Sequence, residues 1–254
     1  MVMKIALVQH DIAWANQEAN FSTLAPLIRE AATNGAQLVV LTEMFSTGFV
    51  VDQQDIGEPE GGASSQFLVR MATENNIHVC GTCPETTEDD IRPYNSFVIA
   101  SPQGTTHRYR KIHPFTYGGE DKHFRPGDQH VTLTIDEVTV SLFVCYDLRF
   151  ADEFWALAHQ TDLYLVPANW PSSRREHWTT LLRARAMENQ AYVAGCNRVG
   201  SGGNLEYSGD SCVIGPFGDI VAAAGADATI LYADIDPHHV KSIRARYPFL
   251  QDRR

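Results

Sequence analysis

Residues 138–150 read VTVSLFVCYDLRF, and their pattern predicts a strand that ends in a turn before a helix. Apolar side chains occupy every second position from Val138 to Val144, as expected for a strand with one face against a core. Residues 151–159 then have a helical pattern, with acidic residues in the first turn. A strand that leads into a helix is typical of α/β proteins, and here the turn between them carries Cys145.

Cys145 has two interpretations. Free cysteine is among the most frequently buried residue types, so this thiol can simply fill the core. A cysteine in a strand-to-helix turn also faces the positive end of the helix dipole, which favours the thiolate and therefore a nucleophile. The stretch alone does not decide between the two.

The composition is ordinary for a soluble globular protein and argues against a disordered or fibrous chain. The chain has 254 residues, 44% of them hydrophobic and 20% charged, and no stretch has the composition of a linker, so we expect one domain over residues 1–254. A net charge of −11 without runs of like charge argues against a nucleic-acid partner. With no apolar run near the roughly 20 residues of a membrane span and no cleavable signal, we expect a cytoplasmic protein without a membrane partner.

Strand-like and helical segments alternate along the whole chain. Strand patterns cover residues 4–10, 36–43, 77–83, 94–101, 107–111, 130–136, 138–145, 162–169, 191–198, 207–216 and 229–236. Helical patterns cover a segment that stops at Asn34-Gly35, and residues 63–75, 151–160 and 174–189. This mixture of helices, strands and hairpins predicts an α/β protein with mixed sheets.

Two halves of the chain resemble each other weakly. NSFVIASPQG (95–104) and DSCVIGPFG (210–218) are each a strand that closes in a Pro-x-Gly turn. In each half a strand also ends in polar residues, at Glu43 and at Asn169, where open α/β sheets collect their reactive groups. Two such halves are expected to pack sheet against sheet as a four-layer α-β-β-α sandwich.

Three reactive residues lie at the boundaries of apolar strands: Glu43, Lys111 and Cys145. Each has a structural alternative, as a solvated carboxylate, an exposed cation and a core side chain respectively. Together they supply a thiol nucleophile, a base that deprotonates it and a cation for the oxyanion that follows.

In chain order, the motifs TEMFSTGF, YRKIHPF and CYDLRF resemble those of the nitrilase superfamily of carbon–nitrogen hydrolases, and the similarity covers nearly all of the chain. EMFSTGF, CYDLRF and ANWP are most similar to the ω-amidase branch, which acts on 2-oxoglutaramate. The resemblance implies that Glu43, Lys111 and Cys145 are catalytic, and that a second glutamate lies between the lysine and the cysteine. We assign it to Glu120, although Asp121 is adjacent.

The resemblance implies a mechanism without metal or cofactor. Glu43 accepts the proton of Cys145, the thiolate attacks the amide carbonyl, and Lys111 stabilises the oxyanion. Ammonia leaves, and a water activated by Glu43 hydrolyses the thioester. Glu120 is expected to orient Lys111 or the substrate nitrogen; its alternative is a surface carboxylate.

The substrate expected from this branch is a small dicarboxylate monoamide such as 2-oxoglutaramate, 2-oxosuccinamate or succinamate, and its free carboxylate requires a cation. Arg149 and either Arg174 or Arg175 are the candidates, although Arg149 can instead pair with a nearby aspartate. The remaining residues expected to bind the substrate are Tyr146, Trp170, Phe45, Phe115 and Asn169. Other amidases of the same superfamily, such as deaminated glutathione or carbamoyl amidases, remain alternatives. The resemblance also implies a homodimer or higher homo-oligomer that uses the C-terminal segment RYPFLQDRR.

Two other classes are weaker alternatives. Cys80 and Cys83 form a C-x-x-C, which suits redox exchange or half of a zinc site, but no second ligand pair accompanies them and the stretch reads as a strand. Metal-dependent phosphoesterases also use four-layer sandwiches, yet His113, His123 and His130 lack paired ligand spacing.

Overall fold

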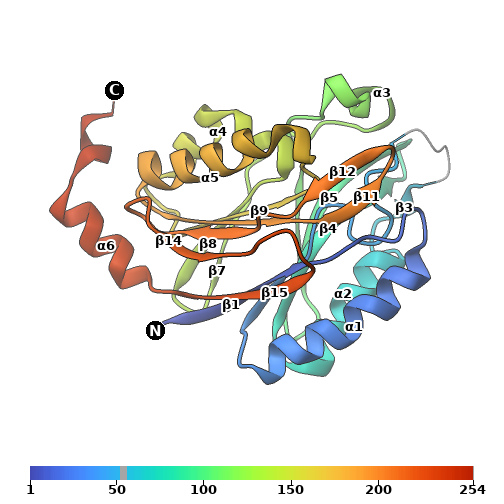
Figure 1. The fold of residues 1–254 in the computed structure, drawn as a ribbon, viewed down its shortest axis with the longest axis horizontal. Helices are drawn as coiled ribbons and strands as arrows, with labels where there is room; N and C mark the ends of the chain where they lie inside the picture. Colours follow the sequence, from blue (N-terminus) through green and yellow to red (C-terminus); the bar gives the residue numbers. More distant parts are fainter. Residues whose placement is uncertain (52–55, 254) are drawn as a thin grey trace.

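The computed structural model describes residues 1–51 and 56–253, and within them two large sheets stack face to face with helices on both outer sides (Figure 1). This is the four-layer sandwich of mixed sheets that the sequence predicted, and the fold class is confirmed. In neighbour order, the first sheet contains β15 (Thr229–Ile235), β1 (Met3–Gln9), β2 (Leu38–Val40), β4 (His78–Thr87), β5 (Asp90–Ala100) and β6 (Thr106–Arg110), with β3 (Glu58–Pro59) beside β4.

The second sheet runs in the order β14 (Ile220–Ala223), β13 (Cys212–Ile214), β10 (Tyr192–Asn197), β9 (Leu163–Ala168), β8 (Val138–Leu142) and β7 (Thr132–Ile135). Its central strands β8, β9 and β10 are parallel, and its outer pairs are antiparallel. A separate hairpin is formed by β11 (Val199–Gly202) and β12 (Leu205–Ser208).

The helices form the two outer layers. Helices α1 (Gln17–Thr33) and α2 (Ala63–Asn75) cover the first sheet, and α4 (Ala151–Leu157) and α5 (Arg175–Asn189) cover the second (Figure 1). Shorter or peripheral helices are α3 (Glu120–His123), α6 (Pro237–Arg246), and the 3-10 turns η1 (Thr116–Gly118), η2 (Cys145–Arg149), η3 (Ser172–Arg174) and η4 (Phe249–Asp252). Helix α1 ends where the sequence indicated, because Gly35 adopts the left-handed conformation (φ 84°) that glycine tolerates.

The alternation of side chains along β1 and β2 explains why the layers stack in this order. Leu7 and Val40 point to the core between the sheets, where they join Val140 and Leu165. Their chain neighbours, such as Val39, point the other way, into the core under α1 and α2. Each such fully buried side chain contributes about 1.5–3 kcal/mol to folding.

Several strands are shorter than the sequence pattern suggested, most of all the one expected over residues 36–43, which is β2 (Leu38–Val40), and one expected strand is divided. The strand expected over residues 138–145 ends at Leu142, because Cys145 adopts a left-handed conformation (φ 45°) and begins η2. The segment expected as one strand over 207–216 divides into β12 and β13, since Gly209 and Asp210 are both left-handed. Both interruptions lie at the edge of the second sheet where its parallel strands end.

Across the described ranges, 1–51 and 56–253, we find no helix with the length and apolar character needed to cross a lipid bilayer.

Candidate active site

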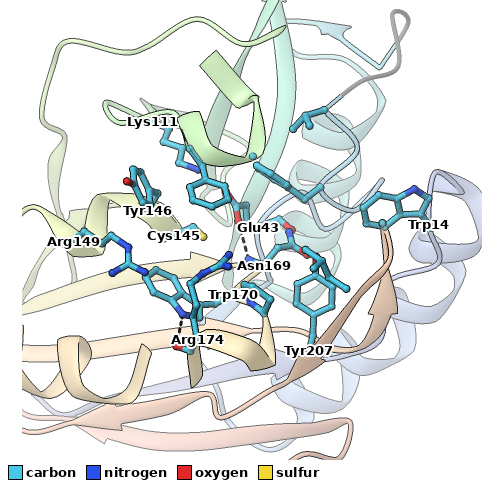
Figure 2. A pocket seen from close by; sticks show the side chains of 17 residues that line it. Trp14, Glu43, Lys111, Cys145, Tyr146, Arg149, Asn169, Trp170, Arg174 and Tyr207 are labelled. Carbon is cyan, nitrogen blue, oxygen red and sulfur yellow. Dashed lines mark hydrogen bonds and ion pairs between the residues drawn. The ribbon is translucent and has the colours of Figure 1, made fainter. Parts of the chain in front are cut away.

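Glu43, Lys111 and Cys145 converge at one end of the sandwich (Figure 2). Glu43 follows β2, Lys111 follows β6, and Cys145 begins the turn after β8. The ammonium of Lys111 donates to Glu43 Oε1 at 3.0 Å, and Glu43 is close enough to Cys145 to raise the pKa of its thiol. The lysine and the glutamate are almost completely buried, and Cys145 retains 8% exposure. A carboxylate, a cation and a sulfur from three distant segments therefore share one site.

Glu120 completes the environment of Lys111. Its Oε2 accepts from Lys111 Nζ at 2.8 Å and from the backbone N–H of Phe115 at 2.6 Å. Glu120 is fully buried whereas Asp121 is exposed, so the geometry favours Glu120 as the second glutamate of the site.

Two asparagines orient the carboxylate of Glu43. The side-chain amide of Asn95 donates to Glu43 Oε1 at 2.9 Å and to Glu120 Oε1 at 3.0 Å. The backbone N–H of Asn169 donates to Glu43 Oε2 at 2.8 Å, and its side-chain amide donates to the carbonyl oxygen of Glu43 at 2.6 Å. Because its backbone and side chain are both held, Glu43 cannot turn away from the cysteine without breaking several hydrogen bonds.

The protonation states follow from burial and charge. Burial alone would lower the pKa of Lys111, but the carboxylates of Glu120 and Glu43 outweigh it and raise that pKa above its usual range. Burial raises the pKa of the Cys145 thiol, Glu43 raises it further, and Lys111 opposes them. The resting site therefore holds a permanent cation beside a neutral thiol, with a carboxylate placed to accept the thiol proton.

A buried aspartate fixes the turn that carries the cysteine. Asp147 accepts hydrogen bonds from the backbone N–H of Val144 (2.9 Å), from the hydroxyl of Tyr109 (2.7 Å) and from the backbone N–H of His113 (2.9 Å). Burial raises the pKa of this carboxyl group to about 6. Since Tyr109 and His113 flank Lys111, one side chain joins the lysine segment to the turn in which Cys145 holds its left-handed conformation.

A cavity of about 300 Å³ opens beside Cys145. Six of the residues expected to bind the substrate line it: Tyr146, Arg149, Trp170, Phe115, Asn169 and Arg174. Phe45 does not, which corrects the sequence-based expectation. Met44 adopts a left-handed conformation and turns the chain, so that Phe45 packs against Phe21 and Phe67 in the core under α1 and α2.

The cavity contains two arginines from different elements. Arg149 stacks over Trp170 at 4.8 Å from the ring centre and bonds to His177 Nδ1 at 3.2 Å, rather than to a nearby aspartate. Arg174 lies 5.3 Å from the ring centre of Phe115. Arg175, the other candidate, points elsewhere and pairs with Asp210 at 2.6 Å.

Several residues of the site carried no clear signal in the sequence. Trp14, Phe49, Leu205 and Tyr207 line the cavity but come from two loops and from the β11–β12 hairpin. Their positions depend on packing between segments that are far apart in the chain. Asn95 lies in the stretch NSFVIASPQG, whose signal in the sequence was its similarity to DSCVIGPFG and not a role in the site.

The C-x-x-C and histidine alternatives find little support in the geometry. Cys80 and Cys83 are both buried in β4 but belong to different cores, one between the sheets and one under the helices. His113 and His130 each bond to a carboxylate oxygen of Glu153, at 2.8 and 2.6 Å.

Comparisons with known proteins agree with this geometry. The sequence profile described as carbon-nitrogen hydrolase matches residues 4–245. The chain is 37% identical to omega-amidase YafV of Escherichia coli (strain K12), covering 98% of this chain and 96% of that protein. It is 31% identical to 2-oxoglutaramate amidase of Bacillus subtilis, covering 99% and 98%. A solved CN-hydrolase superfamily structure from Xanthomonas campestris, with an arsenic adduct in its active site, matches with a TM-score of 0.95 at 31% identity, covering 100% of this chain and 98% of that one.

Proposed function

The chain belongs to the carbon–nitrogen hydrolase family of the nitrilase superfamily, and on that premise we propose that it hydrolyses the terminal amide of a small dicarboxylate monoamide. Membership in this family and the ω-amidase relatives identify the protein as an amide-hydrolysing enzyme. The observation that carries the finer proposal is the pairing of the Glu43–Lys111–Cys145 cluster with arginines in the same cavity.

Cys145 is the nucleophile of the proposed reaction. Its neutral thiol transfers a proton to Glu43 while the sulfur bonds to the amide carbon. The carbonyl electrons move to oxygen, where the ammonium of Lys111 stabilises the negative charge, an interaction worth about 3 kcal/mol in comparable sites. The carboxylic acid of Glu43 then protonates the nitrogen, the carbon–nitrogen bond breaks, and ammonia leaves with a thioester behind it.

Hydrolysis of the thioester restores the enzyme. Glu43 removes a proton from water as the oxygen attacks the thioester carbon, and Lys111 again stabilises the oxyanion. The carbon–sulfur bond breaks, the acid is released, and the proton on Glu43 returns to the sulfur. Glu120 holds the ammonium in place throughout, since it accepts from Lys111 Nζ at 2.8 Å.

The arginines support an anionic substrate. In a protein of net charge −11, a cavity that contains Arg149 and Arg174 is a local site for a carboxylate. The 300 Å³ of space is ample for a five-carbon monoamide and lies within the range of small-molecule sites. The names of the relatives, omega-amidase and 2-oxoglutaramate amidase, describe substrates of this class. Cytoplasmic location and a homo-oligomeric state stay predictions from the sequence.

A panel assay of ammonia release tests the proposal. Succinamate and 2-oxoglutaramate are expected to exceed glutamine, a neutral amide and a simple nitrile in kcat/KM. Cys145→Ala is expected to abolish turnover, and the matched control is Cys212→Ala, which alters a similarly buried thiol outside the cavity. Wild-type turnover by Cys145→Ala, or a preference for neutral amides, would contradict the proposal.

A further inference from the structure

Tyr207 carries a hydroxyl group, lines the cavity and has no role in the mechanism above. The residue is on β12, is 6% exposed and lines the cavity. Its hydroxyl forms no hydrogen bond with any residue in the ranges 1–51 and 56–253. Burial raises its pKa to about 12, so the phenol stays neutral and keeps a proton to donate. A cavity-lining donor with no acceptor among the described residues is available to a ligand.

The ring of Tyr207 is held rigidly from behind. The guanidinium of Arg198 lies 4.5 Å from the ring centre, and this arginine is itself fully buried. Arg198 Nη2 donates to Asp11 Oδ1 at 2.7 Å, and to the carbonyl oxygens of Ile12 and Ser201. Arg198 therefore holds the ring of Tyr207 in place at the wall of the cavity.

Arg174 is a second cation near Tyr207, and unlike Arg198 it lines the cavity. It ends η3, which packs against β12, and its charge acts on Tyr207 after the larger effect of Arg198. In Figure 2 the guanidinium of Arg174 reaches toward Cys145 and Asn169, whereas Arg149 lies at the outer edge of the site. The guanidinium of Arg174 forms no hydrogen bond or ion pair within the described part of the chain, while Arg149 is bonded to His177 and stacked on Trp170.

We propose that Tyr207 and Arg174 together bind the free carboxylate of the substrate, which makes Tyr207 a specificity-determining residue. This inference rests on the proposed function. A guanidinium only donates hydrogen bonds and a neutral phenol can donate one, so the pair suits a carboxylate and gives no equivalent interaction to a methyl group. The carboxylate in turn supplies an acceptor for two groups that have no hydrogen-bond partner among residues 1–51 and 56–253.

The test compares succinamate with butyramide, which replaces the carboxylate by a methyl group. Tyr207→Phe is expected to lower kcat/KM for succinamate by about 10- to 100-fold and to leave butyramide nearly unchanged, since a hydrogen bond to a charged group is lost. Arg174→Gln is expected to lower the succinamate value by about 100-fold. Because both side chains bind one carboxylate, the double variant is expected to lose less than the product of the two effects.

Matched controls separate this role from a structural one. Tyr232→Phe removes a hydroxyl outside the cavity, and Arg175→Gln alters the neighbouring arginine that pairs with Asp210. Neither is expected to change the ratio of succinamate to butyramide. Calorimetric binding of succinamate to Cys145→Ala should weaken by the same factor when Tyr207→Phe is added.

The outcomes distinguish the two proposals. If the wild-type enzyme cleaves no amide of the panel, the proposed function is wrong, and this inference is wrong with it. If the enzyme prefers succinamate and Tyr207→Phe keeps that preference, or if Arg149→Gln removes it while Arg174→Gln does not, this assignment alone is overturned.

Discussion

Replacing Glu120 by glutamine removes one charge from the site while keeping the shape of the side chain. In the native protein, Oε2 accepts short hydrogen bonds from Lys111 and from the N–H of Phe115, and Oε1 accepts from Asn95. Glutamine has one acceptor oxygen. If that oxygen faces Lys111 and Phe115, the amide nitrogen of the new residue meets the amide nitrogen of Asn95, and two donors oppose each other.

The magnitude follows from these contacts. Two hydrogen bonds lose their charge-assisted part, about 1 kcal/mol each, and a buried donor on Asn95 loses its partner, at about 1–3 kcal/mol. We therefore expect the free energy of unfolding to fall by about 3 kcal/mol. With Glu120 neutral, Lys111 is drawn toward Glu43 and away from the oxyanion, so kcat is expected to fall by about 100-fold, equivalent to about 2.7 kcal/mol.

The assay combines ammonia release from succinamate with denaturant unfolding. The matched control is Glu85→Gln, because Glu85 is also buried, pairs with Arg108 at 3.0 Å and accepts from Ser65 at 2.6 Å, but lies outside the cavity. Glu85→Gln is expected to lose similar stability and to keep its kcat. A kcat for Glu120→Gln within about threefold of wild type, or an equal loss of kcat in the control, would refute the reasoning.

Three further substitutions give independent tests. Burial lowers the pKa of His10 to about 4, so between pH 6.5 and 4 the unfolded chain binds a proton that the folded protein does not, and the free energy of unfolding decreases as the pH decreases. His10→Gln should remove about 2 kcal/mol of this decrease between pH 7 and 5 in urea titrations. An unchanged dependence of stability on pH would contradict this. A Cβ on Gly202 would lie 2.4 Å from the ring of Trp14, so Gly202→Ala should shift the hairpin that forms one wall and raise KM more than it lowers kcat; an unchanged KM would show that the wall is not part of the binding site. Tyr109→Phe removes a donor to Asp147 and should lower kcat and slow iodoacetamide alkylation of Cys145, whereas alkylation at the wild-type rate would mean that this contact does not position the thiol.

The sequence predicted those parts of the protein that depend on local pattern. Alternating apolar residues in the strands and capping signals at the helix ends predicted the four layers. The polar ends of two apolar strands predicted that Glu43 and Asn169 lie at one edge of the sheets, where the structure brings them into contact. The structure also brings Lys111 and Cys145 to this edge, because strands of the two sheets end there together.

Packing between segments far apart in the chain determines the positions of the site residues that the sequence did not predict. Phe45 was expected in the pocket because it follows Glu43 closely, but the left-handed conformation of Met44 turns it into the core. Tyr207 had no signal as a cavity residue, because its segment looked like part of a longer strand until Gly209 interrupts it. Such reversals of direction depend on single backbone angles, which a hydrophobicity pattern does not specify.

The most direct measurement is to trap the covalent intermediate. Wild-type enzyme mixed with succinamate, quenched in acid within the first turnovers and analysed by peptide mass spectrometry, is expected to carry a succinyl group on the peptide that contains Cys145. The adduct is expected to disappear when hydroxylamine is added before the quench. An unmodified Cys145 during rapid turnover, or an acyl group attached to a different residue, would contradict the central claim that this thiol, deprotonated by Glu43, attacks the amide.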